Sequence, residues 1–361
     1  MTDPLSRKVR RALHPLYRSL ETRVHPLRYL FIEITRRCNL ACRHCGSDCT
    51  TETPFQELTT DEWLRFFEFV GGNFDTRRLM LVLTGGEPLC RPDFEKILGG
   101  LRDNRLYWGM VTNGYALDER RLRLLNEARL WSVTVSIDGL EQNHDWLRGR
   151  QGSFERALSA VRLLASSKIP MMDVVTCVNP RNLAELPEVA RTLVGAGVKK
   201  WRLFSIFPTG RAATDPELSL SDGQFRELMD FIAGMRNGAA PGGLAVEYCC
   251  EAFLPPHVDR EVRDDPYFCR AGICIGSVLC DGSISACPNI SRSLVQGNVR
   301  THDFKKVWET GFASFRDRSW MRTGECADCT HWSRCQGNSM HLWDAERGRT
   351  ARCFHSLFPS S

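Results

Sequence analysis

The sequence contains no long apolar segment, and this absence limits the classes of protein to consider. No run approaches the roughly 18–20 apolar residues that a transmembrane helix needs, so we expect no membrane span. Residues 1–13 include basic side chains but neither an apolar stretch nor a small-residue cleavage site, so we expect no secretory signal. Internal repeats and low-complexity tracts are also absent, which argues against a repeat protein. The net charge of +5 is too small to require an acidic or nucleic-acid partner.

Cysteine, by contrast, is abundant, with 16 residues in a chain of 361. A disulfide framework suits short secreted proteins, whereas this chain is long and groups its cysteines at short spacings. Thiolates bound to metal in a reducing compartment explain the pattern better. We therefore expect a cytoplasmic metalloprotein.

The first 28 residues form a segment rich in arginine. Apolar residues recur there at helical spacing, although Pro15 and Pro26 interrupt the pattern. We expect residues 1–28 to be a basic helical extension that packs on the core and turns a solvated face outward. Docking of an acidic peptide or a nucleic acid is the alternative, which charge alone cannot decide.

From residue 29 onward, short β-rich runs alternate with amphipathic segments. Helical patterns occur near residues 60–70, 92–103, 118–128, 153–167, 182–196 and 221–236. The runs between them predict six strands, Tyr29–Thr35, Leu79–Thr84, Tyr107–Thr112, Trp131–Ser136, Met171–Thr176 and Lys199–Ile206. Alternating strands and helices imply a parallel sheet, so residues 29–236 predict an α/β domain curled into a partial (β/α)6 barrel of the TIM type.

The character of the sequence changes after about residue 238. A stretch rich in glycine, proline and alanine opens a predicted linker, residues 237–265. Helical periodicity then fades and cysteines become frequent. We expect residues 266–361 to form a small cysteine-rich domain that is held together by metal rather than by a hydrophobic core.

Three cysteines follow the first predicted strand at once. Cys38, Cys42 and Cys45 have a C-x3-C-x2-C spacing. One loop can present three such thiolates to a [4Fe–4S] cluster and leave the fourth iron open to a small molecule. A structural zinc is the alternative, with Cys49 or His44 as its fourth ligand.

Polar loops that contain glycine end the next three predicted strands. Their residues are Gly85, Gly86, Glu87 and Pro88 after the second strand, Asn113 after the third, and Ser136 and Asp138 after the fourth. The paired glycines permit close approach to a ligand, and Glu87 offers a carboxylate to an ammonium group. Because the carboxyl ends of parallel strands share one mouth of a barrel, we expect these residues and the three cysteines to face one cavity.

At these positions, and over about residues 29–236, the sequence resembles the radical S-adenosylmethionine (SAM) superfamily. The resemblance implies that the three cysteines hold a [4Fe–4S] cluster whose open iron binds SAM. It implies a SAM-binding set of Gly85, Gly86, Glu87, Pro88, Asn113, Ser136 and Asp138. Reductive cleavage of SAM would then yield a 5′-deoxyadenosyl radical that takes a hydrogen atom from the substrate. His44 stands where many members carry an aromatic residue, which should alter adenine packing but not cluster ligation.

A second group of cysteines resembles the SPASM domain, an auxiliary iron–sulfur module. Its members are Cys269, Cys287, Cys326, Cys329, Cys335 and Cys353. The last four make a complete thiolate set for one cluster, with zinc as the alternative. The family pattern has a further cysteine where this chain has Ser339, so we expect one or two auxiliary clusters, the second of them irregular. That irregular site, at the first two cysteines, would need help from Cys274, Cys280, Cys249 or Cys250.

The resemblance implies a radical SAM enzyme that abstracts hydrogen from a peptide or small protein, since SPASM modules accompany such enzymes. Its partners would be that substrate and an electron donor such as flavodoxin or ferredoxin, with no membrane and no nucleic acid. Processing of tetrapyrrole side chains in a heme pathway is the alternative among enzymes. A zinc-stapled nucleic-acid-binding protein is the alternative from another class, although the Gly-Gly-Glu-Pro loop argues against it.

Overall fold

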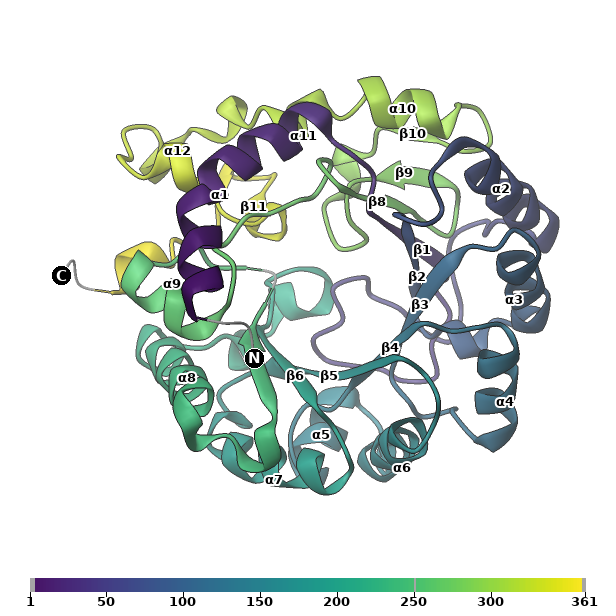
Figure 1. The fold of residues 1–361 in the computed structure, drawn as a ribbon, viewed down its shortest axis with the longest axis horizontal. Helices are drawn as coiled ribbons and strands as arrows, with labels where there is room; N and C mark the ends of the chain where they lie inside the picture. The colour runs from purple at the N-terminus through teal and green to yellow at the C-terminus, as the bar shows by residue number, and fades with distance from the viewer. Residues whose placement is uncertain (1–3, 250, 359–361) are drawn as a thin grey trace.

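The structure, a computed structural model, describes residues 4–249 and 251–358 (Figure 1). Six parallel strands lie side by side in sequence order. They are β1 (Tyr29–Thr35), β2 (Met80–Gly85), β3 (Tyr107–Thr112), β4 (Ser132–Ser136), β5 (Met171–Val178) and β6 (Lys200–Ser205). Each falls on a run predicted to be a strand, and Figure 1 shows the sheet curving as part of a barrel. The predicted α/β fold is confirmed.

Helices cover the outer face of this curved sheet (Figure 1). They are α2 (Thr60–Asn73), α3 (Phe94–Asp103), α4 (Glu119–Glu127), α5 (Glu141–Arg148), α6 (Ser153–Ala165), α7 (Leu186–Gly195) and α8 (Asp222–Gly234). Capping boxes start α2 at Thr59 and α8 at Ser221. Helix α5 was not predicted, and it proves important for the site. No described helix is both long and apolar enough to cross a membrane.

The sheet continues beyond the six strands on both sides. β7 (Ala245–Tyr248) pairs in parallel with β6, and β8 (Ile275–Val278) pairs in parallel with β1. The antiparallel strands β9 (Ser283–Ser285) and β10 (Gly297–Asn298) follow β8. The stretch predicted as a linker therefore contains β7 and also α9 (Pro256–Val262). The domain limits themselves stay a prediction.

The N-terminal extension is a continuous helix, α1 (Pro4–Val24), with Pro15 inside it rather than at a break. Arg11 donates to the Asp259 carboxylate of α9 at 3.0 Å. Glu21, which is buried, pairs with Arg270 at 2.8 Å. These ion pairs fix α1 to the C-terminal half of the chain, so part of its charged surface is used for internal contacts.

The C-terminal region contains α10 (Phe304–Thr310), α11 (Ala313–Arg316), α12 (Trp332–Cys335), and the short hairpin of β11 (Trp343–Asp344) and β12 (Arg349–Thr350). Aromatic residues of α10 and α11 are buried in the same core as the barrel. The ring of Phe304, for example, meets that of Phe66 of α2 at 5.4 Å. The expectation that metal replaces a hydrophobic core here is therefore wrong. The break between two short helices hid the apolar periodicity.

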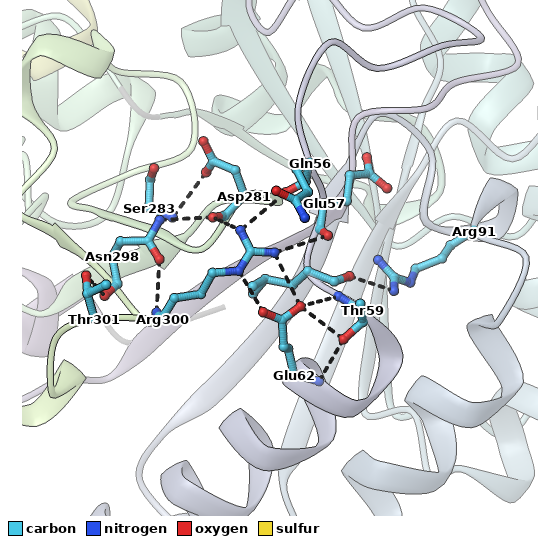
Figure 2. Close-up of polar contacts among 11 residues, drawn as sticks. Gln56, Glu57, Thr59, Glu62, Arg91, Asp281, Ser283, Asn298, Arg300 and Thr301 are labelled. Carbon is cyan, nitrogen blue, oxygen red and sulfur yellow. Dashed lines mark hydrogen bonds and ion pairs between the residues drawn. The ribbon is translucent and has the colours of Figure 1, made fainter.

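Arg300, which follows β10, clamps the C-terminal region to the start of α2 (Figure 2). Its guanidinium donates to the Glu62 carboxylate at 2.6 Å and to the main-chain carbonyls of Gln56 and Glu57 at 3.4 and 3.3 Å. It also donates to the carbonyl of Asp281 at 3.1 Å. Its hydrogen bond to Glu62 lowers the pKa of that carboxyl to about 2. One side chain thus joins segments 238 residues apart.

Candidate cluster and cofactor site at the barrel mouth

The loop after β1 carries Cys38, Cys42 and Cys45, which pack together in a small cluster that also includes Cys49. Each of the three sulfur atoms accepts a hydrogen bond from a different part of the chain. The donor to Cys38 is the Asn113 side chain at 3.8 Å, and the donor to Cys42 is Arg148 at 3.7 Å. The main-chain N–H of Cys49 lies 3.3 Å from the sulfur of Cys45. The loop therefore presents three thiols with donors already aimed at them.

Arg211, in the loop after β6, donates hydrogen bonds to the main chain of the cysteine loop. Its main-chain N–H donates to the carbonyl of Cys45 at 3.1 Å. Its guanidinium donates to the carbonyls of Cys42 and Cys49 at 2.8 and 3.0 Å. These bonds fix main-chain groups and leave the sulfur atoms free for metal.

The two glycines of the loop after β2 allow it to lie directly against the start of the cysteine loop. Gly85 has φ +145°, and a Cβ atom there would stand 2.1 Å from the carbonyl oxygen of Thr35. A Cβ atom on Gly86 would stand 2.3 Å from the carbonyl oxygen of Arg37. The N–H groups of Gly86 and Glu87 instead donate to those two carbonyls at 2.8 and 2.9 Å. Only glycine fits at both positions.

Glu87 is fully buried, and its carboxylate already holds three hydrogen bonds. One oxygen accepts from the Thr112 hydroxyl at 2.8 Å and from the N–H of Leu89 at 3.2 Å. The other accepts from the N–H of Asn113 at 2.8 Å. Burial raises the pKa of Glu87, and none of its three donors is cationic. A carboxylate offers about four acceptor positions, so one remains, and a cationic donor such as an ammonium group is the kind of partner that this carboxylate lacks. Pro88 begins the short 3-10 helix Pro88–Cys90, which follows Glu87 directly.

Asp138, just beyond β4, forms the other polar centre of the mouth. It is fully buried and pairs with Arg148 at the end of α5, with the Nε and Oδ2 atoms 2.6 Å apart. Burial would raise the pKa of Asp138, but Arg148, helped by two nearby histidines, holds it below its usual value. Arg148 thereby connects Asp138 to the sulfur of Cys42. Ser136, at the end of β4, is buried two residues before Asp138.

His44, Asp138 and Cys177 bring three potential ligand atoms within 4.8 Å of one another, the only such set among the residues the structure describes. The guanidinium of Arg148 contacts the same Asp138 oxygen that His44 approaches, which disfavours a metal ion there.

The predicted four-thiol set gathers in the C-terminal region at α12 and its flanks. Burial raises the pKa of Cys335 to about 12, and negative charge on Cys353, Cys326 and Cys329 contributes to this increase. The four cysteines therefore belong to one neighbourhood of the fold, and their joint ligation of a cluster stays a prediction.

The two remaining cysteines of the predicted second site, Cys269 and Cys287, are neighbours: burial is the main cause that raises the pKa of Cys287, and negative charge on Cys269 adds to it. The companions proposed for them lie elsewhere. Cys280 faces Glu33, Cys274 faces Glu21, and the sulfur of Cys249 accepts from Arg202. Cys250 is outside the described residues.

Sequence reasoning missed Arg148 and Arg211 as site residues. Arg148 could have been found, because residues 141–149 have the features of a helix. Glu141 lies in the first turn, a basic residue lies in the last turn, and Gly149 occupies the C′ position. Arg211 lies in the short 3-10 helix Gly210–Thr214, which is too short for a sequence pattern to mark it.

The comparisons with known proteins agree with this geometry. The family model described as the radical SAM superfamily matches residues 32–193, and that described as an iron–sulfur cluster-binding domain, SPASM, matches residues 269–330. An AdoMet-dependent heme synthase of Methanosarcina barkeri is 28% identical over 84% of this chain and 89% of its own. A PqqA peptide cyclase of Gluconobacter oxydans is 28% identical over 87% and 86%, respectively.

Solved structures share the fold. Streptococcus suis SuiB bound to precursor peptide SuiA gives a TM-score of 0.67 at 14% identity, over 89% of this chain and 74% of that one. Native anSMEcpe with bound AdoMet gives 0.68 at 19% identity, over 89% and 91%.

Proposed function

The chain belongs to the radical SAM superfamily and carries a SPASM domain, and from this premise we propose that it modifies a peptide or small protein by hydrogen abstraction. It is an enzyme that uses a [4Fe–4S] cluster and SAM, with auxiliary iron–sulfur clusters in its C-terminal domain. The PqqA peptide cyclase relative matches this chain along most of both lengths, which supports a peptide substrate.

The observation that carries the proposal is a cavity of about 290 Å3 lined jointly by the cysteine loop and the C-terminal domain. Gly46 and Ser47 line it from the loop, and Met340 and His341 line it from the C-terminal side. Ser47 donates to Asn289 at 3.1 Å across the boundary. Small-molecule sites usually measure roughly 300–1,000 Å3, so this cavity suits one side chain of a peptide lying outside it better than a whole macrocycle.

We assign the SAM-site cluster to Cys38, Cys42 and Cys45. When bound, the cluster and SAM supply one-electron reductive cleavage and hydrogen-atom abstraction. Arg148 and Asn113 donate to two of the sulfur atoms and would stabilise negative charge there.

SAM itself would be held by the loops after β2, β3 and β4. Glu87 would accept the ammonium group, and Gly85 and Gly86 bring the main chain against the cysteine loop. Asn113, Ser136 and Asp138 remain assigned to the ribose and substrate side. For Asp138 that role is indirect, because both its oxygens already bind the chain, one to Arg148 and one to the N–H of Cys177.

Electrons would come from a flavodoxin or ferredoxin. A reducing, cytoplasmic location follows from the many thiols that must stay available for iron. The electron donor and the location are both inferred from the chemistry of the cluster.

Tetrapyrrole modification is the second candidate, because heme synthases are among the relatives. Arg36 and Arg292 lie over the ring of Phe55 at 4.7 and 4.2 Å, and both line the cavity. Arg292 already pairs with Asp281 at 2.6 Å, so Arg36 is the guanidinium that would pair with a carboxylate, whether on a tetrapyrrole or on an acidic peptide.

The test is anaerobic reconstitution with iron and sulfide, followed by incubation with SAM, a reductant and one of two probes. One probe is a set of synthetic peptides encoded beside the gene, and the other is an iron coproporphyrin. We expect 5′-deoxyadenosine and a peptide mass change in matching amounts. Turnover of the porphyrin alone would overturn the peptide proposal.

Cys42→Ala should abolish 5′-deoxyadenosine formation, and Cys274→Ser is the matched control. Cys274 is also buried, but its thiol faces Glu21 rather than the three loop thiols. The Cys274→Ser variant should therefore leave the reaction intact. Unchanged cleavage by Cys42→Ala would refute the cluster assignment.

A further inference from the structure

Ser339 occupies the position at which the SPASM pattern has a cysteine, and its surroundings explain how the chain can do without that thiolate. The residue is fully buried and caps the short 3-10 helix Met340–Leu342. Its hydroxyl oxygen accepts from the N–H of His341 at 3.3 Å and lies 3.0 Å from Nδ1 of the same histidine. The hydroxyl of Ser339 is therefore engaged with both the main chain and the ring of His341.

The other ring nitrogen of His341 points at one of the two orphan cysteines. Its Nε2 atom lies 3.2 Å from the sulfur of Cys287. The ring is backed by Phe207, with the centroids 4.5 Å apart, so its orientation is restrained from a second side. The loop after β6 thus supports the imidazole as well as the cysteine loop.

Cys269 reaches the same place from the other side. Its thiol faces the main-chain N–H of Met340, the residue before His341. The buried guanidinium of Arg318 donates to the carbonyls of Cys269 and Asn338 at 3.0 and 3.2 Å. These bonds hold the segment of Cys269 against the segment of Ser339 and His341.

We propose that His341 Nε2 is a ligand of the auxiliary cluster at Cys269 and Cys287, with Ser339 fixing the tautomer. If Nδ1–H donates to the Ser339 hydroxyl, the lone pair lies on Nε2, facing the sulfur of Cys287. Histidine ligands in metal sites regularly use their other nitrogen to bind such an orienting partner. Imidazole replaces thiolate at iron–sulfur clusters of the Rieske type, so the donor set is chemically sound. The proposal rests on the iron–sulfur nature of the C-terminal domain but not on the identity of the substrate.

Pulsed EPR of the reduced, reconstituted full chain tests this ligand directly. Cys38→Ala/Cys42→Ala/Cys45→Ala serves as the background, because it removes the SAM-site cluster and leaves the auxiliary signals. We expect a strong hyperfine coupling to nitrogen that changes when the protein is made with 15N-histidine. The coupling should vanish in His341→Ala and persist in the matched control His331→Ala, since the His331 ring stacks on His355 at 4.0 Å instead of facing Cys287.

His341→Cys guards against a variant that fails to fold. It should keep the iron content, lose the nitrogen coupling and lower the midpoint potential, because a thiolate adds negative charge that imidazole does not. Absence of any histidine coupling in the background protein, or its survival in His341→Ala, would overturn the proposal. Loss of SAM cleavage or a different substrate would leave these spectra untouched, so the two proposals fail separately.

Discussion

We predict that Glu251→Gln stabilises the protein at pH 8 while changing its stability little at pH 5. Glu251 follows β7 and is 1% exposed. One carboxylate oxygen accepts from the Tyr248 hydroxyl at 2.6 Å and from the N–H of Ser205 at 3.1 Å. The Ser205 hydroxyl donates to it as well. All of these donors are neutral, so the buried charge is only partly compensated. Glutamine keeps an acceptor for them and removes the charge.

The magnitude follows from the pKa. Burial raises the pKa of Glu251 to about 7, against 4.5 for an unperturbed glutamate. The folded protein therefore binds the proton more tightly than the unfolded chain, and the free energy of unfolding falls as pH rises from 4.5 through 7. One pKa unit corresponds to about 1.4 kcal/mol, so the full loss is about 3 kcal/mol, of which about 2.5 kcal/mol lies between pH 5 and pH 8.

Anaerobic denaturant unfolding of the reconstituted protein at both pH values measures this effect. The difference between variant and wild type removes the contribution of every other titrating group. Glu247→Gln is the matched control, because Glu247 lies on the same strand, is partly exposed and pairs with Lys200 at 3.1 Å. It should show no such pH dependence. A Glu251→Gln protein that loses as much stability as wild type between pH 5 and pH 8 would refute the reasoning.

Three further predictions follow from charged contacts. Glu87→Gln should weaken SAM binding roughly 10- to 100-fold, the effect of losing a charge-assisted hydrogen bond, with iron content unchanged in the same sample. Arg148→Met should lower the free energy of unfolding by about 3–5 kcal/mol because it leaves the buried carboxylate of Asp138 without its partner. Adding Asp138→Asn should restore most of that loss. A double variant that recovers no stability would contradict the ion pair. Arg300→Ala should lower the free energy of unfolding by about 1–2 kcal/mol. This is less than the sum for its hydrogen bonds because the side chain is 30% exposed and solvent screens its interactions. Arg120→Ala, whose side chain is 71% exposed, should cost less than about 0.5 kcal/mol, and equal effects for the two would argue against the clamp.

The barrel could be predicted because its signals are local. Each of the six strands is a short apolar run followed by a polar loop, and the loop after β1 is recognisable by the spacing of its three cysteines. Glu87 could be placed at the mouth from its position after a strand, without knowledge of its partners. That placement needs only the rule that parallel strands end on one side.

The rest depends on contacts between distant residues. β8 pairs with β1 across about two thirds of the chain, and its four residues carry too little pattern to be recognised alone. The aromatic core of α10 and α11 is divided between two short helices. The sequence shows His341 only as a histidine among the C-terminal cysteines. The orientation of its ring is fixed by Ser339 and Phe207. Residue spacing predicts neither this orientation nor the tautomer.

The pairing of β8 with β1 makes the barrel and the C-terminal domain a single thermodynamic unit. Residues Tyr29–Ile32 of β1 are matched with residues Ile275–Val278 along one side and with β2 along the other. A chain ending at residue 265 would leave that side of β1 without partners, including the main chain around the fully buried Leu30 and Ile32. An unpaired strand edge with an apolar face is a template for aggregation. The C-terminal domain therefore protects the edge of the barrel in addition to holding iron, and it cannot swing away during turnover without breaking the sheet.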